Sequence, residues 1–430
     1  MRFGRGSRGM GRGVGCLESL RLPAAIFVLL VVLIVSTPAR ARWYGWYTKT
    51  LPKATFFIEE SFILAEVKNA WDNEGKLGPI VQPEGRYEPT TGEFLGTLIP
   101  NAEATHEILV SMVQYGLLDN LTLVLAVPLV LRTEVKPNFA WEPGDIIAQY
   151  GRRFETQEDF WAYASGYGQP RVEDWVGNQG TLSDIVLGTR LRFTDWISWF
   201  DRHGLAGAFT LYGSLPTGTP PDPEEMATAG TTTWSLHFQG EAGLHLSADK
   251  SFRSLDDRFL LGLDLFYELF FRHEYVTPTG VKHKILLIDQ DKEAGPTYTI
   301  DPGDFYGASL AVEFIPWKGP AWGTWLTKGS VEKALELPPL LTFSFFYTHT
   351  RFGQTDWESL SPLWDWEDQE EIWRPGYKNI LTGTATVSLL RLGVPLQLFA
   401  SYRNQSWIPG KNFRAADVIN TGFRVPLKFW

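Results

Sequence analysis

Two histidines and a glutamate recur at intervals of four residues in one stretch of the sequence, a combination that could bind a metal ion. His237, Glu241 and His245 lie within 233–247, where even positions are mostly apolar and odd positions are polar or small. This alternation predicts a β-strand, along which a spacing of four residues separates side chains by roughly 13 Å. One metal ion cannot bridge that distance, and the related zinc-protease motif needs a helix. We therefore expect no metal site, and no other cofactor is indicated.

A second group of residues could be catalytic. Thr348 and Thr350 flank His349 near the expected outer end of a strand. Barrel enzymes that cleave lipids would need a histidine that activates a hydroxyl. Successive residues on a strand point to opposite faces, so His349 cannot easily reach either threonine. We expect no catalytic residues and no enzyme activity, and a lipid-modifying barrel enzyme remains the second alternative function.

Strands with one apolar and one polar face position all of these residues. Between 258 and 272 the odd positions are apolar, such as Leu263, and the even ones are mostly polar or small, such as Asp264. Alternation over this length indicates a strand between an apolar and a polar environment, longer than the about 5–6 residues usual in soluble proteins. Twelve such strands are expected, at about 56–67, 105–115, 120–132, 183–193, 205–215, 232–247, 258–273, 304–315, 340–350, 380–390, 395–404 and 416–430.

The lengths of the connections predict how these strands are arranged. If the chain starts in the periplasm, loops after odd-numbered strands are extracellular and should be long. Long connections follow the odd strands, for example 133–182 and 351–379, whereas 116–119 and 391–394 are short and only 316–339 breaks the rule. This sorting favours an all-β fold, a transmembrane antiparallel up-and-down barrel of about 12 strands with long extracellular loops. A secreted soluble β-rich protein is the alternative.

The N-terminus predicts export. Five arginines precede an apolar run over 24–35, and Ala39-Arg40-Ala41 follows. This order is typical of a secretory signal peptide over 1–41, cleaved near Ala41, and the run is shorter than the about 20 residues of a membrane helix. The mature chain would then comprise a periplasmic N-terminal segment over 42–55 and a barrel over 56–430 in the outer membrane of a Gram-negative cell.

Composition narrows the choice of partners. The formal net charge is −10, and the signal peptide would remove six arginines and one glutamate, so the mature chain is acidic and no nucleic-acid partner is expected. Aromatic residues make up 14% of the chain, as expected of a barrel with aromatic girdles. The expected partners are outer-membrane lipid and lipopolysaccharide, the barrel-assembly machinery, and an unknown small-molecule solute.

Polar residues on the inner faces of the strands are the first candidate functional site. Mixed charges across a lumen create a transverse field that discriminates between solutes. The same residues could instead form ion pairs that fill the interior, and twelve strands lie between filled small barrels and open porins. Both interpretations stay open for the candidate lumen-lining residues, which are Arg190, Arg192, His237, Gln239, Glu241, His245, Asp264, Glu268, Arg272 and Arg424.

The loop over 133–181 is the second candidate site. Loops of this length are usually functional or disordered, and disordered segments are poor in aromatic residues. The loop could therefore fold into the lumen as a constriction, or pack against neighbouring loops. Its aromatic residues are Trp141, Phe154, Phe160, Trp161, Tyr163, Tyr167 and Trp175.

Three short motifs carry a resemblance to a known family. The sequences YGLLDNLTL at 115–123, LSDIVLG at 182–188 and LPTG at 215–218 occur in the order found in outer-membrane transporters of the phenol meta-pathway type. That family is loosely similar to outer-membrane transporters of fatty acids and aromatic compounds. The resemblance implies a barrel that passes small, apolar or aromatic molecules by passive diffusion. A structural barrel with a plugged lumen and partner-binding extracellular loops is the first alternative.

Overall fold

A computed structural model represents the chain. It describes residues 47–81, 83–87, 92–144, 154–166, 174–177, 179–218, 240–276, 297–320, 322, 337–359 and 374–428. The predicted signal peptide, the candidate lumen residues His237 and Gln239, and Tyr167 of the candidate constriction loop lie outside these residues.

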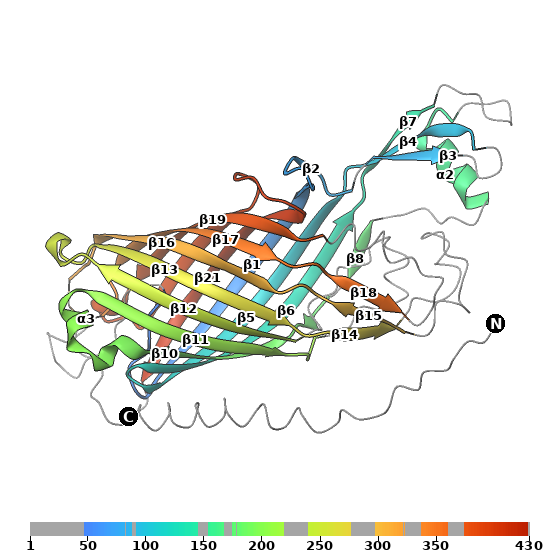
Figure 1. The fold of residues 1–430 in the computed structure, drawn as a ribbon. Coiled ribbons are helices and arrows are strands. Elements are labelled where there is room, and N and C mark those ends of the chain that lie inside the picture. Colours follow the sequence, from blue (N-terminus) through green and yellow to red (C-terminus); the bar gives the residue numbers. More distant parts are fainter. Residues whose placement is uncertain are drawn as a thin grey trace, which may run out of the picture. The chain divides into compact units, whose positions relative to one another are not determined.

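Twelve antiparallel strands form a closed barrel (Figure 1). They are β1 (Thr55–Trp71), β5 (Glu103–Leu118), β6 (Leu121–Lys136), β10 (Ile185–Arg192), β11 (Leu205–Leu215), β12 (Glu241–Ser251), β13 (Phe259–Phe270), β16 (Phe305–Trp317), β17 (Leu341–Phe352), β19 (Gly376–Ser388), β20 (Gln397–Asn404) and β21 (Phe413–Lys428). Each strand pairs with the next along the chain, and β21 returns to pair with β1. The predicted all-β, up-and-down barrel is confirmed.

The seam between the first and last strands closes the barrel. The register runs from Thr55 opposite Lys428 to Trp71 opposite Phe413, with one bulge near Val67. Pro426 lies within this ladder although it cannot donate a backbone hydrogen bond. Closure leaves the wall without an unpaired strand edge, as a barrel in lipid requires.

The two faces of the wall differ as the alternation predicts. On β13, Leu263 is 41% exposed whereas Asp264 is 4% exposed. Apolar side chains on the outer face of the neighbouring strands are also exposed, including Leu246 and Leu310. The outer surface is therefore apolar across several strands, which suits contact with hydrocarbon.

The connections sort into two kinds, as predicted. Four of the five connections after even-numbered strands of the barrel are short, and the one between β16 and β17 is the exception. Three of the short ones carry helical turns, namely η1 (Phe193–Trp196), α3 (Ser198–Arg202), η2 (Arg253–Leu255) and η5 (Leu390–Leu392). Gly393 ends η5 with a φ of 88°, which glycine adopts without strain. The long connection over 316–339 falls mostly on residues outside the described ranges. Among the described residues, no helix is both long and apolar enough to cross a membrane.

The connections at the other end carry secondary structure of their own. One small sheet contains β3 (Glu84–Tyr87), β4 (Phe94–Pro100) and β7 (Phe139–Pro143), and another contains β14 (His273–Val276), β15 (Thr297–Asp301) and β18 (Asp356–Ser359). Helix α2 (Gln157–Gly166) packs on the first sheet. Short strands β2 (Leu77–Pro79), β8 (Trp175–Gly177) and β9 (Thr181–Leu182) pair with β1 or β6.

The face assignment predicts opposite effects for two arginine substitutions. Leu263→Arg places a charge against lipid, at a cost of about 2–4 kcal/mol near the bilayer midplane. Thr384→Arg places the same side chain in the polar interior and should leave folding nearly unchanged. The measurement is the folded fraction recovered in outer membranes, seen as the heat-sensitive band of the intact barrel on a gel. Equal losses for both variants would contradict the assignment.

Candidate functional site in the barrel lumen

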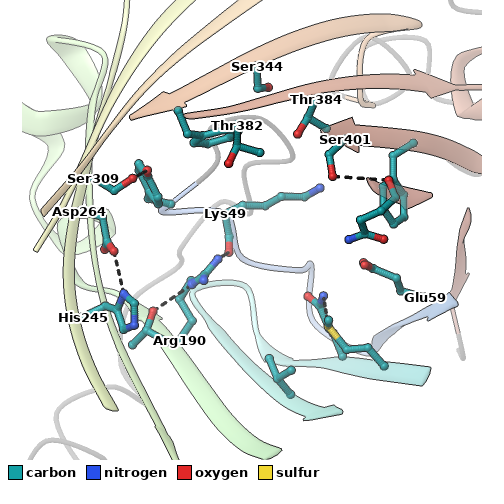
Figure 2. Close-up of a pocket in the computed structure, with 18 of the residues that line it drawn as sticks. Lys49, Glu59, Arg190, His245, Asp264, Ser309, Ser344, Thr382, Thr384 and Ser401 are labelled. Carbon is teal, nitrogen blue, oxygen red and sulfur yellow. Dashed lines mark hydrogen bonds and ion pairs between the residues drawn. The ribbon is translucent and has the colours of Figure 1, made fainter. Parts of the chain in front are cut away.

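The interior of the barrel contains a cavity of about 730 Å³. Its wall is built by inward-facing residues of the barrel strands together with Tyr47, Lys49 and Leu51, which precede the first strand. Figure 2 shows polar side chains from several strands converging on this space. A volume of this size is within the range of small-molecule pockets.

The chain segment before β1, residues 47–54, enters the barrel: residues 47–51 lie inside it, and Lys53 is exposed at its end. Tyr47 Oη donates a hydrogen bond of 2.5 Å to Ser309 Oγ on β16. The backbone N and the Oγ1 of Thr48 donate to the same oxygen of Asp249 on β12, at 2.8 and 2.6 Å. Both strands are about 200 or more residues away from this segment along the chain. The hydrogen bonds to them hold the segment within the lumen.

The rest of this segment is attached to the turn between β5 and β6. Thr50 Oγ1 donates to the carbonyl of Asp119 at 2.9 Å, and Leu51 N donates to Thr122 Oγ1 at 2.8 Å. The sequence analysis predicted that residues 42–55 lie in the periplasm. It did not predict that part of this segment, residues 47–51, lies inside the barrel. Alternation describes strands, and no local pattern shows that a non-strand segment enters a barrel. The hydrogen bonds that draw it inside join residues about 70 to 260 positions apart along the chain.

Two glycines make room for the inner segment. A Cβ at Gly262 on β13 would lie 2.8 Å from the Tyr47 ring, and a Cβ at Gly116 on β5 would lie 2.1 Å from the carbonyl oxygen of Pro52. Neither position tolerates a side chain while the segment stays in place. Such close backbone approach is a usual reason for glycine within a strand.

Lys49 extends from the inner segment into the cavity (Figure 2). Its Nζ lies 5.4 Å from the centroid of the Phe57 ring, and its backbone carbonyl accepts a hydrogen bond of 3.4 Å from Arg190. Within the described part of the chain, no hydrogen bond or ion pair engages Nζ. The ammonium group is therefore presented to the cavity.

Hydroxyl side chains cover much of the cavity wall. They alternate with apolar residues on β17 and β19, so each strand turns every second residue inward. The hydroxyl-bearing lining residues of β17, β19 and β20 are Thr342, Ser344, Thr348, Thr350, Thr382, Thr384, Thr386, Ser388 and Ser401. The candidate lumen residues predicted from the sequence are mostly charged and do not include these hydroxyl-bearing residues, although the alternation that places them is visible in the sequence.

Charged groups also line the cavity, and several of the carboxylates are engaged. Asp264 Oδ2 lies 2.7 Å from His245 Nδ1, and Asp264 Oδ1 accepts from Ser247 at 2.6 Å. Glu59 pairs with Arg424 at 2.7 Å across the seam between β1 and β21. The interior therefore contains both features that the sequence left open. Ion pairs link neighbouring strands of the wall, and an open cavity remains between them.

The structure distributes the predicted lumen residues over several places. Of the candidates, Arg190, His245, Asp264, Glu268 and Arg424 line the cavity. Arg192 is fully buried and pairs with Asp195 of η1 through bonds of 2.5 and 2.6 Å. Arg272 lies beyond the end of β13 and pairs with Glu358 of β18 at 2.6 Å. Glu241, at the start of β12, is not part of the cavity lining.

The aromatic residues of the candidate constriction loop lie apart from the cavity. Trp141 stacks on Phe160 at 4.6 Å between ring centroids, and Phe160 and Trp161 pack with Leu98 of β4. The other members divide between two further clusters: Phe154 and Tyr163 pack near Leu95, and Trp175 packs against residues of β1, β5 and β6. The rings among the described residues are packed in these clusters, and none of them lines the cavity.

His349 faces away from its threonine neighbours. Thr348 and Thr350 line the cavity, whereas His349 Nδ1 lies 2.8 Å from the side-chain oxygen of Asn379 on β19. The alternation of the strand separates the histidine from both hydroxyls. Among the described residues, no group of three or more potential ligands is arranged to hold a metal ion.

Comparison with solved structures finds proteins with a similar barrel. The COG4313 outer membrane channel from Pseudomonas putida F1 matches 89% of this chain and 99% of its own, with a TM-score of 0.52 and 12% identity. The fold is that of an outer-membrane β-barrel.

The translocator domain of the autotransporter NalP from Neisseria meningitidis covers 95% of this chain and 97% of its own, at 8% identity and a TM-score of 0.37. The CymD monoaromatic hydrocarbon channel covers 88% and 90%, at 9% identity and a TM-score of 0.33. No protein-family model and no curated protein matches the sequence.

The anchoring of the inner segment can be tested at Asp249. Asp249→Ala removes the acceptor of both Thr48 hydrogen bonds, and bonds to a charged group contribute about 1.5–3 kcal/mol each. The segment should then leave the lumen more often, and trypsin should cleave after Lys49 at least several-fold faster than in the unchanged barrel. Asp356→Ala, which removes a carboxylate from β18 outside the cavity, is the control. Unchanged protection of Lys49 would show that the segment does not depend on Asp249.

Proposed function

We propose that this chain is an outer-membrane channel that passes small molecules by passive diffusion and has no enzyme activity. The observation that carries the proposal is a closed barrel whose polar interior contains a cavity of about 730 Å³. A barrel wall satisfies the backbone of every strand in lipid, and a polar interior offers solutes a path away from the hydrocarbon.

The outer surface supports a location in the outer membrane. Leucine, phenylalanine and tyrosine side chains are exposed along the outer faces of β13, β16 and β17. Exposed apolar surface on this scale needs a non-aqueous environment. The arginine-rich N-terminus and the Ala39-Arg40-Ala41 site are consistent with export through a cleaved signal peptide.

The inner segment supports a narrow rather than a wide path. Residues 47–54 occupy part of a twelve-stranded lumen, which is smaller than that of porins with 16–18 strands. Solutes would pass between this segment and the hydroxyl-bearing wall of β17, β19 and β20. Small molecules are the class that such a path admits.

The second candidate is a structural barrel with a plugged lumen that binds a partner through its extracellular part. The same inner segment favours it, because buried Thr50 and Leu51 fill part of the interior. The sheets β3–β4–β7 and β14–β15–β18 would then supply the binding surface. Channel recordings separate the two candidates.

Conductance of the mature chain tests the proposed function directly. Refolded residues 42–430 should give discrete current steps in planar bilayers, smaller than those of a water-filled porin because the segment narrows the lumen. The same protein denatured before addition is the control. Silent bilayers from samples that are shown to be folded would exclude the channel and favour the plugged barrel.

A matched pair of tryptophan substitutions locates the path. Thr382 lines the cavity, whereas Leu381 next to it on β19 does not. Thr382→Trp should lower the single-channel conductance about twofold or more because its ring enters the lumen, and Leu381→Trp should not, since successive strand residues face opposite ways. Equal conductance for the two folded variants would place the path elsewhere.

A further inference from the structure

We propose that the lumen holds a binding site for a small organic anion with an apolar body, in which the Lys49 ammonium group is the main anion-binding group. This inference rests on the proposed function, because it names the class of solute that the channel would favour. It adds a site on the inner segment, outside the barrel strands, where the sequence placed no functional residue.

The position of Lys49 is fixed by its neighbours in the chain. Tyr47 and Thr48 are tied to β16 and β12, and Thr50 is tied to the carbonyl of Asp119. Lys49 lies between these anchors, and its own carbonyl accepts a bond from Arg190. The backbone is therefore held on both sides of the lysine, while the side chain extends into the cavity (Figure 2).

In the described part of the chain no carboxylate lies within ion-pair distance of Lys49 Nζ, and Glu313 and Glu59 attract its charge only from farther away. Glu59, a carboxylate of the cavity, is paired with Arg424 at 2.7 Å. Asp264 is engaged by His245 and Ser247. An ammonium group away from bulk water is costly unless it is paired, so a bound anion would stabilise this arrangement.

The balance of the other charges also favours an anion. Five cationic side chains line the cavity, namely Lys49, Arg190, Lys378, Arg403 and Arg424, against the four carboxylates Glu59, Asp264, Glu268 and Glu313. In the described part of the chain, the Arg403 guanidinium group, like the Lys49 ammonium group, makes no hydrogen bond or ion pair. A cationic solute would meet these free charges and be repelled, whereas an anion would be attracted.

Hydroxyl and aromatic groups specify what kind of anion fits. Thr384 and Ser401 occupy facing positions on β19 and β20, and both line the cavity. The Ser401 hydroxyl donates to the backbone carbonyl of Asn420 at 3.5 Å, so the Thr384 hydroxyl is the one that can donate to a carboxylate held by Lys49. The centroid of the Phe57 ring lies 5.4 Å from Lys49 Nζ, and Phe399 also lines the cavity. The Phe57 ring provides an apolar surface beside the Lys49 ammonium group, whereas Arg424 lies over the Phe399 ring at 4.3 Å. An apolar surface next to a positive charge suits a carboxylate on an apolar or aromatic body better than an inorganic ion.

Three probes of nearly equal size test the site on the unmodified protein. Benzoate, benzamide and benzylamine differ mainly in charge, so their rates of entry into liposomes that contain the mature chain compare anion, neutral molecule and cation. We expect benzoate to enter fastest and benzylamine slowest. Benzoate should also reduce the chloride current in planar bilayers as it occupies the site. A channel without a preference for benzoate would overturn the inference and leave the proposed function standing.

Variants of Lys49 then assign the preference to this residue. Lys49→Met should lower benzoate entry about tenfold relative to benzamide, a fold-change that corresponds to about 1.4 kcal/mol at 25 °C. Lys49→Arg should keep most of the preference because it keeps the charge. Lys53→Met is the matched control, since Lys53 is exposed on the same segment and does not line the cavity.

The outcomes separate the two proposals. Conducting channels in which Lys49→Met keeps the full benzoate preference would falsify the site and not the channel. Bilayers that stay silent with folded wild-type protein would overturn the channel itself, and the site with it. If Lys49→Met does not fold, Lys49→Gln provides a second test, and the comparison of the three probes on the unmodified protein decides without any variant.

Discussion

The backbone amide and carbonyl groups of a strand in lipid must find their partners within the protein, because hydrocarbon offers none. The pairing of β1 with β21 satisfies this requirement for the whole wall. It joins the first and last strands of the chain over their full length, and it is reinforced inside the barrel by the ion pair between Glu59 and Arg424. Every other feature of the molecule follows from closure: a wall with one apolar and one polar face, two ends with different connections, and an interior that is isolated from lipid.

Closure also creates a space that polar side chains alone do not fill. The chain fills part of it with its own residues 47–54, which are held by hydrogen bonds to Asp249, Ser309 and the turn at Asp119. Gly262 and Gly116 provide room for this segment on the wall. The same contacts that narrow the lumen place Lys49 inside it. A single arrangement therefore determines both the width of the path and the charge that a solute meets there.

The long connections at one end of the barrel are organised by packing of their own. Aromatic residues of the loop between β6 and β10 pack on β4, which belongs to the loop between β1 and β5. The lobe built from these two loops has a small core, so its rings are buried in it and do not reach the cavity. In the proposed channel, solute selection would therefore depend on the interior groups of the barrel and of the inner segment.

The sequence by itself determined the number of barrel strands, their inner and outer faces and the sorting of short and long connections. Each of these depends on local spacing, such as the alternation of Leu263 with Asp264, which a strand translates directly into two faces. Only the tertiary structure decided which polar residues meet in the lumen. Arg192 and Arg424 are both arginines on inward-facing strand positions in the sequence pattern, yet one pairs with Asp195 in a turn and the other lines the cavity. Thr48 and Asp249 are 201 positions apart. Contacts at such separations are set by barrel closure and strand register, which no local period encodes.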